Sequence, residues 1–343
     1  MNLEIFNYHL PKKLIAQKPV SPRDRSKFLI YDKSKDKIKH DSFYNLPKYL
    51  DSNDVLVFNN SKVFPARLKA YKSTGGKIEI FLLQDLGKGK WECLIGGKLG
   101  EVRELDKDKL KANILEKLEN GNWLVKFNLA GKQFDEFLNK YGETPLPPYI
   151  KTKDSKLIRE KYQTIYAKQQ GSVAAPTAGL HFTKKLLKEL NKKGVQTEFV
   201  TLHVGLGTFA PVKTKKIEDH KIHKEFGILD KQTCERLNKA KKQGKRIIAV
   251  GTTSIRVLES AFKEKSLKPF SNWIDLFIYP GYSFKFVDAI ITNFHLPKSS
   301  LLMLVSAFIK KDKTGVNRLM EIYKKAIKKR YRFYSFGDAM FIK

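Results

Sequence analysis

Short runs of apolar residues without alternation occur at several points in the chain, and each run ends in polar residues or glycine. Two clear examples are 55–58, which is followed by Asn59-Asn60-Ser61, and 289–292, which is followed by Asn293. Unbroken apolar runs are typical of strands that are buried on both faces of a sheet. The segment 198–204, rich in apolar and β-branched residues, and the start of 246–260 are further predicted strands.

Helical signals follow several of these strands. Thr183 is a predicted N-cap for a helix over 184–193, and Gly194 ends that helix. Amphipathic spacing predicts further helices over 230–242 and 313–330. Strands that alternate with helices predict an α/β domain with a largely parallel sheet.

The pattern changes between residues 62 and 148. Short, alternating segments separated by turns predict a small antiparallel β-barrel, with strands in 66–71, 75–83, 90–96 and 122–128. Because parallel-type strands lie on both sides, we expect 62–148 to be an inserted domain and residues 1–61 and 149–343 to form the α/β domain. Three prolines in 142–150 predict a stiff return linker.

Candidate chemistry gathers where the predicted strands end. In VTLHVGLGTFAPV (200–212) a strand end is followed by glycines, which let a backbone approach a ligand closely. The residues of interest there are His203, Gly205, Gly207, Thr208 and Phe209. A tight strand turn with a core histidine is the alternative interpretation.

A second such segment is GSVAAPTAGLHFT (171–183). Its small residues leave backbone amides open to a ligand, and the residues singled out are Pro176, Thr177, Gly179, His181 and Phe182. His181 lies just before a helix N-terminus, whose dipole disfavours the protonated imidazole. A neutral imidazole is suited to act as a base. A packed loop histidine explains the same pattern.

Polar groups also follow the other strands. Thr252, Thr253 and Ser254 open a helix, where free amides and hydroxyls bind anions, and Arg256 adds a cation. Helix capping is the simpler explanation. The remaining candidates are Asn60, Asn293, Phe294, His295, Arg23, Tyr279 and Asp338. Asn60 is equally compatible with an Asx turn, and Arg23 with an ion pair to Asp24.

Parallel strands end on one side of a sheet, so these groups are expected to share one edge. Several hydrogen-bond donors, two or more imidazoles and the rings of Phe182, Phe209, Tyr279 and Phe294 are suited to a nucleoside-like ligand. His220 and His223 have a metal-like spacing, but no third ligand is evident, and no metal is expected.

The net charge of the chain indicates a polyanionic partner. The 343 residues carry a formal charge of +32, which fits nucleic acid, although a lysine-rich proteome would also produce it. Two distant cysteines argue against a disulfide framework or a metal cluster. No apolar run approaches 18 residues, so a cytoplasmic protein is expected.

The chain resembles the S-adenosylmethionine:tRNA ribosyltransferase-isomerases of queuosine biosynthesis. The matching strings, in family order, are DVLVFNNSKVFPARL, PLPPYI, VAAPTAGLHF, TLHVGLGTF, IEDHKIH, AVGTTSIRVLES, TNFHLPKSSLLMLVSAF and YRFYSFGDAMFI. Ser172 stands where the family usually has alanine, and 84–140 fits no strict pattern.

The resemblance implies that the ribosyl part of S-adenosylmethionine is transferred to 7-aminomethyl-7-deazaguanine at the tRNA wobble position. The product is epoxyqueuosine, with adenine and methionine released. S-adenosylmethionine is then a co-substrate and no resident cofactor is needed. The implied partner is a tRNA with a GUN anticodon, and a monomer is expected.

This chemistry needs a base for a proton on the 5′ carbon and an acid for the departing adenine. We assign proton transfer to His203 and His181, with His295 and Asp338 as second choices. Phe209 and Phe294 would face the base or the sulfonium, and Thr252, Thr253, Ser254 and Arg256 would hold a carboxylate or a phosphate. The alternatives are a non-catalytic RNA-binding protein and an S-adenosylmethionine-dependent RNA methyltransferase.

Overall fold

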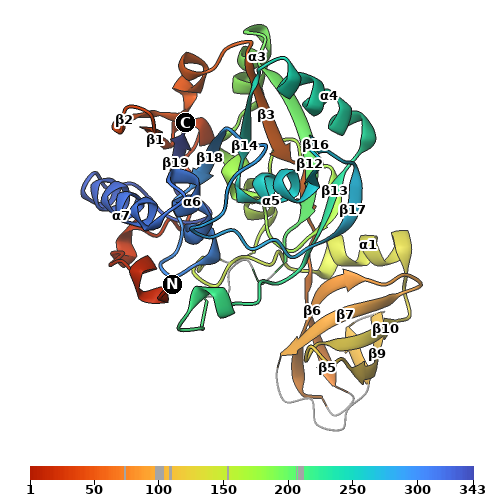
Figure 1. Cartoon of the computed structure of the whole chain (residues 1–343). Coiled ribbons are helices and arrows are strands. Elements are labelled where there is room, and N and C mark those ends of the chain that lie inside the picture. Colours follow the sequence, from red (N-terminus) through yellow and green to blue (C-terminus); the bar gives the residue numbers. More distant parts are fainter. Residues whose placement is uncertain (73–74, 97–103, 108–109, 153, 206, 208–211) are drawn as a thin grey trace.

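The computed structural model describes the chain except for residues 73–74, 97–103, 108–109, 153, 206 and 208–211. Its largest feature is a nine-stranded sheet with the order β17-β13-β12-β3-β14-β18-β19-β1-β2 (Figure 1). The strands are β1 (Lys27–Asp32), β2 (Lys37–Ser42), β3 (Asp54–Asn59), β12 (Gln196–His203), β13 (Glu225–Leu229), β14 (Arg246–Val250), β17 (Phe270–Ile274), β18 (Ala289–Asn293) and β19 (Ala339–Ile342).

The sheet is mixed. Of its eight strand pairings, four are parallel and four antiparallel. The prediction of a largely parallel sheet is therefore not confirmed for the sheet as a whole. The four central strands, β12, β3, β14 and β18, are parallel as expected. The edges differ because β13 and β17 return antiparallel, and because β19, from the C-terminus, enters between β18 and β1.

Helices cover the sheet, and the central strands are buried on both faces. In β3 every residue is buried, and neighbouring residues belong to different cores. Val55 and Val57 pack in the core that contains α4 (Lys231–Lys242), α5 (Thr252–Ala261), α6 (Ser300–Ile309) and α7 (Lys313–Lys328). Leu56 and Phe58 pack in the core that contains α3 (Lys184–Lys192). Unbroken apolar runs are thus explained by burial on both sides.

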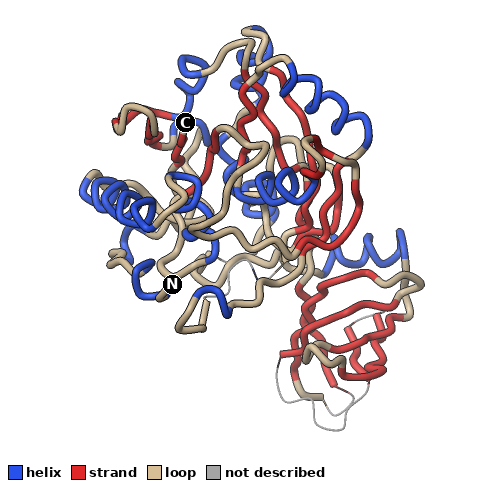
Figure 2. The backbone as a smooth tube through the Cα atoms, in the orientation of Figure 1, coloured by secondary structure: helices blue, strands red, loops and turns tan. Residues whose placement is uncertain are grey.

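A closed barrel with the strand order β10-β7-β6-β5-β8-β9 projects from this body (Figures 1 and 2). Its strands are β5 (Arg67–Lys72), β6 (Lys77–Asp85), β7 (Lys90–Gly96), β8 (Glu104–Lys107), β9 (Leu110–Lys117) and β10 (Trp123–Phe127), and their pairings are antiparallel. Helix α1 (Gly131–Tyr141) adds Phe134, Phe137 and Leu138 to the barrel core. The predicted domain limits, 62–148, stay a prediction.

The remaining elements are short. They are β4 (Ser61–Val63), β11 (Gln169–Ser172), β15 (Phe262–Lys263), β16 (Ser266–Leu267), helix α2 (Lys156–Lys161) and the 3-10 helices η1 (Leu3–Phe6), η2 (Lys12–Leu14), η3 (Arg23–Arg25), η4 (Phe43–Tyr49), η5 (Thr177–His181) and η7 (Ile217–Asp219). The predicted N-cap Thr183 accepts a hydrogen bond from the first turn of α3. The helix predicted over 230–242 begins at Lys231, and Asp230 is its N-cap.

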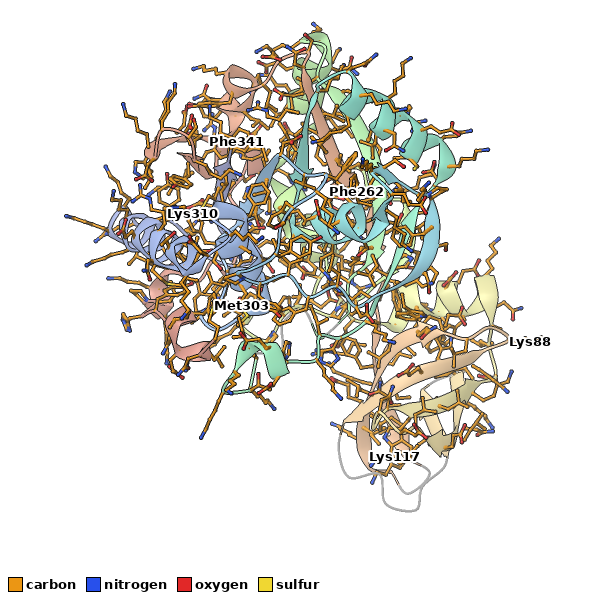
Figure 3. All side chains as sticks on the ribbon, viewed as in Figure 1. Lys88, Lys117, Phe262, Met303, Lys310 and Phe341 are labelled. Atoms are coloured by element: carbon orange, nitrogen blue, oxygen red, sulfur yellow. The ribbon has the colours of Figure 1, made fainter. Side chains whose placement is uncertain are left out.

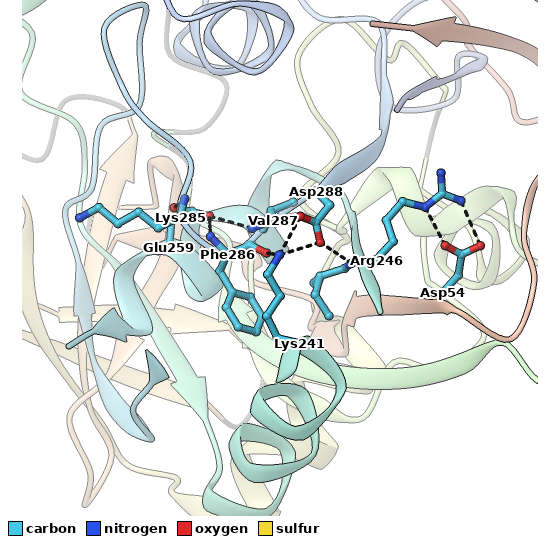
Figure 4. A network of polar contacts seen from close by, with 9 residues as sticks. Asp54, Lys241, Arg246, Glu259, Lys285, Phe286, Val287 and Asp288 are labelled. Carbon is cyan, nitrogen blue, oxygen red and sulfur yellow. Dashed lines mark hydrogen bonds and ion pairs between the residues drawn. The ribbon is translucent and has the colours of Figure 1, made fainter. Parts of the chain in front are cut away.

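Charged side chains hold the starts of the central strands (Figure 4). Arg246 of β14 forms a bidentate ion pair with Asp54 of β3, at 2.7 and 3.0 Å. Asp288, just before β18, accepts hydrogen bonds from Lys241 and from the backbone N–H of Ile247. These contacts fix the parallel register at the amino ends, so the carboxyl ends are aligned as well.

A buried carboxylate at Glu259 of α5 orders the segment before β18. It accepts hydrogen bonds from the backbone N–H groups of Lys285, Phe286 and Val287, at 2.9 to 3.1 Å (Figure 4). It also accepts one from the Tyr282 hydroxyl at 3.0 Å. Burial of backbone N–H groups is tolerated when such an acceptor is present.

We expect Glu259→Ala to lower the free energy of unfolding by about 3 kcal/mol, because it leaves several buried donors without an acceptor. Urea denaturation measures the change. Glu235→Ala, at an exposed position of α4, is the control and should change stability by less than about 0.5 kcal/mol. Equal effects of the two substitutions would contradict this role of Glu259.

Candidate functional site

One segment of small residues, 171–181, crosses the carboxyl ends of the central strands. The Val173 N–H donates to the carbonyl of Val204, the residue after β12, at 3.0 Å. Ala178 lies beside Gly251, the residue after β14. The Thr177 hydroxyl donates to Oδ1 of Asn293, the last residue of β18, at 3.0 Å. The segment therefore brings the predicted strand-end groups to one edge.

His203 lies at one end of this edge. Its Nδ1 is 3.2 Å from the Ser61 hydroxyl, which also contacts the Ser172 hydroxyl. Ser172 Oγ in turn accepts a hydrogen bond from the Val204 N–H at 2.8 Å. Both serines are fully buried, whereas His203 is half-buried. The Ser61 hydroxyl thus holds the ring, and the Ser172 hydroxyl in turn positions Ser61.

Gly171 allows the His203 ring to take this position. Its φ is +144°, and a Cβ at this residue would lie 2.7 Å from ring atoms of His203. No other residue type fits such an approach. Burial lowers the pKa of His203 below its usual range, so the imidazole is neutral at neutral pH.

His181 lies in a separate hydrogen-bond network. The Asn293 side-chain amide is 3.1 Å from His181 Nε2, and the Ser26 hydroxyl is 2.8 Å from Nδ1. Because an amide nitrogen only donates, Nε2 accepts and the proton resides on Nδ1. Burial and the nearby cations Arg332 and Arg23 lower the pKa of His181 to about 3. This imidazole is therefore neutral, and both of its nitrogens are occupied.

The N-terminus of α5 follows Gly251, whose φ is +91°. No side chain caps this helix within the described part of the chain. The Ser254 hydroxyl donates to the Val250 carbonyl at 3.0 Å, while the buried Thr253 hydroxyl has no partner among the described residues. Thr252 is buried as well. Free helix amides with a spare hydroxyl can bind an anionic group.

Arg256 has a different environment from the one expected. It forms a buried ion pair with Glu225, and it donates to the carbonyls of Leu276 and Ile274 at 3.2 and 3.1 Å. Glu225 also accepts from the Gly205 N–H at 2.8 Å. Protein groups thus occupy the guanidinium, and its ion pair with Glu225 helps to fix the carboxylate that holds the Gly205 N–H.

Sequence reasoning missed Glu225, and also Ser26 and Ser61. Glu225 occupies an inward position of a short alternating strand, in the burial pattern BiBiB. An acidic residue on the apolar face of a strand is the one signal that could have marked it, because a buried carboxylate needs a partner.

Two of the predicted rings are enclosed in cores. Phe294 is fully buried among Tyr323, Tyr331 and Phe333, at centroid distances of 5.1 to 5.4 Å. Phe182 is fully buried against Phe43 and Phe58. Neither ring is open to a ligand here, because the apolar faces of both are used in packing.

The second-choice residues for proton transfer, His295 and Asp338, also form hydrogen bonds within the protein. His295 is buried, with Nε2 3.2 Å from the Thr292 hydroxyl, and burial lowers its pKa to about 3. Its Nδ1 has no partner among the described residues. Asp338 accepts from the backbone N–H groups of Lys27 and Arg332 and pairs with the Arg332 guanidinium at 3.2 Å. Asp338 therefore links β1 to the C-terminal segment.

Other predicted residues line or support the same edge. Asn60 Oδ1 accepts from the Thr201 hydroxyl at 2.7 Å. Arg23 donates to the Gln163 carbonyl at 3.0 Å, and Asp24 accepts from Thr183, so the expected Arg23–Asp24 pair is not found among the described contacts. Pro176 precedes η5.

The glycines mark places of close packing. A Cβ at Gly179 would lie 1.9 Å from the Tyr166 hydroxyl, and one at Gly207 would lie 2.3 Å from the His223 ring. Tyr279 packs against Phe277, at a centroid distance of 5.0 Å. Thr208 and Phe209 lie outside the described residues.

Within the described part of the chain, no group of three or more His, Cys, Asp or Glu side chains is placed to hold a metal ion. No helix there is long and apolar enough to cross a membrane.

The fold and this edge define an α/β protein with a polar site at the carboxyl ends of its central strands. The sequence model of the queuosine biosynthesis protein family matches residues 3–342. The chain therefore belongs to this family.

Two relatives and one solved structure match this chain over all or nearly all of its length. The chain is 47% identical to the S-adenosylmethionine:tRNA ribosyltransferase-isomerase of Aquifex aeolicus and 49% identical to that of Natranaerobius thermophilus, with 100% of each chain covered. It is 38% identical to the crystal structure of the S-adenosylmethionine tRNA ribosyltransferase from Thermotoga maritima, with a TM-score of 0.56 and coverage of 99% and 100%.

The low pKa of His181 predicts a pH-dependent stability. The unfolded chain binds a proton near pH 6.5, whereas the folded chain binds it near pH 3, so stability falls as the pH drops through this interval. Between pH 6.5 and 5 the loss is about 2 kcal/mol. Urea denaturation at pH 7 and pH 5 should show a difference that is about 2 kcal/mol smaller in His181→Gln.

The exposed His9 provides the control, and His9→Gln should keep the wild-type difference between the two pH values. If His181→Gln also kept it, the buried neutral state of His181 would be refuted.

Proposed function

We propose that this chain is an S-adenosylmethionine:tRNA ribosyltransferase-isomerase. It transfers and isomerises the ribosyl part of S-adenosylmethionine onto 7-aminomethyl-7-deazaguanine at the tRNA wobble position, giving epoxyqueuosine with release of adenine and methionine. The observation that carries the proposal is the full-length identity of 47–50% to relatives that bear this name. The polar edge formed by separate strand ends supplies the donors and imidazoles that such a ligand needs.

His203 is the residue that we assign to proton transfer. Ser61 engages its Nδ1, which leaves Nε2 to exchange a proton with the substrate. Its neutral, half-buried imidazole is suited to act as a base toward the acidic 5′ carbon next to the sulfonium. His181 has both nitrogens engaged, so we give it the role of orienting Asn293 and, through it, the Thr177 hydroxyl.

The N-terminus of α5 is the proposed site for the methionine carboxylate. Its free amides, the Thr252 hydroxyl and the unpartnered Thr253 hydroxyl can accept a negative group without help from Arg256. S-adenosylmethionine is a co-substrate in this proposal, and no resident cofactor or metal takes part.

The proposed RNA partner is a tRNA with a GUN anticodon, bound by a monomer in the cytoplasm. Basic side chains stand around the surface of both the main body and the barrel, including Lys88, Lys117 and Lys310 (Figure 3). Such a distribution supports binding of a polyanion, and affinity for tRNA should fall steeply with salt.

Adenine release from S-adenosylmethionine tests the function directly. We expect release with tRNA that carries 7-aminomethyl-7-deazaguanine and none with unmodified tRNA. S-adenosylhomocysteine as the product would instead identify a methyltransferase. Binding of the modified tRNA without either product would identify a non-catalytic RNA-binding protein. Chromatography of the reaction products separates these outcomes.

Replacement of His203 tests the proton-transfer role. We expect His203→Gln to lower kcat for adenine release by about 10²- to 10⁴-fold, because a positioned base contributes a factor of this size. His9→Gln is the control and should react as the wild type does. Normal turnover by His203→Gln would assign the base to another residue.

A further inference from the structure

Three aromatic side chains lie in register on adjacent strands and lead away from the candidate site. His203 of β12 is directly opposite Phe226 of β13, and Phe226 is directly opposite Trp273 of β17. Directly opposite residues of antiparallel strands point to the same face of the sheet. His203, Phe226 and Trp273 therefore form a continuous aromatic row, named here the aromatic ladder.

The rings of the aromatic ladder contact one another. His203 and Phe226 have nearly parallel planes, 10° apart, with centroids 6.4 Å apart. Phe226 and Trp273 meet edge to face, at 5.5 Å and 75°. Both separations lie within the range of favourable aromatic pairs.

Exposure increases along the aromatic ladder. His203 and Phe226 are half-buried, and Trp273 is 44% exposed on the last strand of the sheet (Figure 1). The opposite face of the same strands is closed, since Glu225, Leu229 and Ile274 are all buried there. Of the two faces of these strands, the one that carries the aromatic ladder is therefore the exposed one.

Packing between strands accounts for Phe226 but not for Trp273. Cross-strand aromatic pairs stabilise a sheet by up to about 1 kcal/mol. A large exposed ring on an edge strand, however, invites unwanted association, and folded proteins usually avoid it there. An exposed tryptophan in line with a candidate catalytic histidine is better explained by a ligand that stacks on it.

The charge around the aromatic ladder selects the kind of ligand. Two exposed lysines lie on segments that adjoin it, Lys168 just before Gly171 and Lys224 just before Phe226, and neither has an ion pair within the described part of the chain. Lys188 and Lys192 line a groove of about 430 Å³ with Phe58 and Phe199. Phe199 points to the same face of β12 as His203, because strand side chains repeat every two residues. Cations without ion pairs on the same side of the sheet as the exposed Trp273 ring fit single-stranded RNA, with phosphates on the lysines and a base on the ring.

We propose that the aromatic ladder is a stacking platform for an unpaired anticodon-loop base next to the nucleotide that reacts. The proposal rests on the proposed function, since His203 is both the inner end of the ladder and the assigned base. With the reacting nucleotide at His203, a neighbouring base splayed out of the loop would lie over Phe226 and Trp273.

Binding of an anticodon stem-loop RNA, modified with 7-aminomethyl-7-deazaguanine at the wobble position, tests the platform. We expect Trp273→Ala to raise the Kd by about 5- to 100-fold, the range that loss of one base–aromatic stack produces. Trp273→Tyr keeps a ring and should stay within about threefold of the wild type. Fluorescence anisotropy of the labelled RNA measures the Kd.

Tyr44→Ala, which removes another exposed ring, is the matched control and should leave the Kd unchanged. The salt dependence of log K should have the same slope in Trp273→Ala as in the wild type, because no phosphate contact is removed. The KM for S-adenosylmethionine should also be unchanged. A shallower salt slope, or equal Kd values for Trp273→Ala and the wild type, would overturn the platform.

Adenine release by the wild-type protein separates this proposal from the proposed function. Release together with unchanged RNA binding by Trp273→Ala would refute the platform and leave the function intact. Absence of release together with weaker RNA binding by Trp273→Ala would refute the function and support an RNA-stacking surface. Thermal unfolding of both Trp273 variants should match the wild type, because the side chain is exposed.

Discussion

The close passage of segment 171–181 over the ends of the central strands is the constraint on which the site depends. Backbone can lie against strand ends only where side chains are absent or small. Gly171 leaves room for the His203 ring, and Gly179 leaves room for the Tyr166 hydroxyl. Ala174 and Ala178 are buried between them. A single larger residue at either glycine would move the segment away, and with it Thr177 and its contact to Asn293.

Burial divides the work among the histidines of this edge. His181 and His295 are deeply buried, and the same desolvation lowers the pKa of each to about 3. Such imidazoles stay neutral and serve as fixed hydrogen-bonding groups. His203 is half-buried, and Ser61 orients its ring. The residue type is the same in all three positions, so the environment alone makes His203 the one suited to exchange protons with a ligand.

The sequence was informative where local pattern determines structure. The buried runs in β3 and β18 and the cap at Thr183 follow from burial and from hydrogen bonding within a few residues, and these predictions are confirmed. The sheet edges depend on pairings between distant segments, such as β18 with β19, which no local pattern encodes.

Local pattern was equally unable to predict which distant residues contact the site residues. Spacing placed Arg256 one turn into α5 but could not reveal that Glu225, 31 residues away, would occupy its guanidinium. Phe294 directly follows a strand end, yet the aromatic residues of the C-terminal segment enclose its ring. A strand-end position therefore predicts proximity to the edge, whereas availability to a ligand depends on partners that arrive from elsewhere in the chain.

Charge and aromatic surface carry different information about an RNA partner. The net charge of +32 is spread over the whole surface, so it raises affinity for any polyanion without marking a position. The aromatic ladder is local, because strand register fixes His203, Phe226 and Trp273 in one row. Electrostatic attraction decays slowly and brings RNA to the surface, whereas stacking acts only at contact. A row of rings that begins at the assigned base can therefore supply the positional information that the charge lacks.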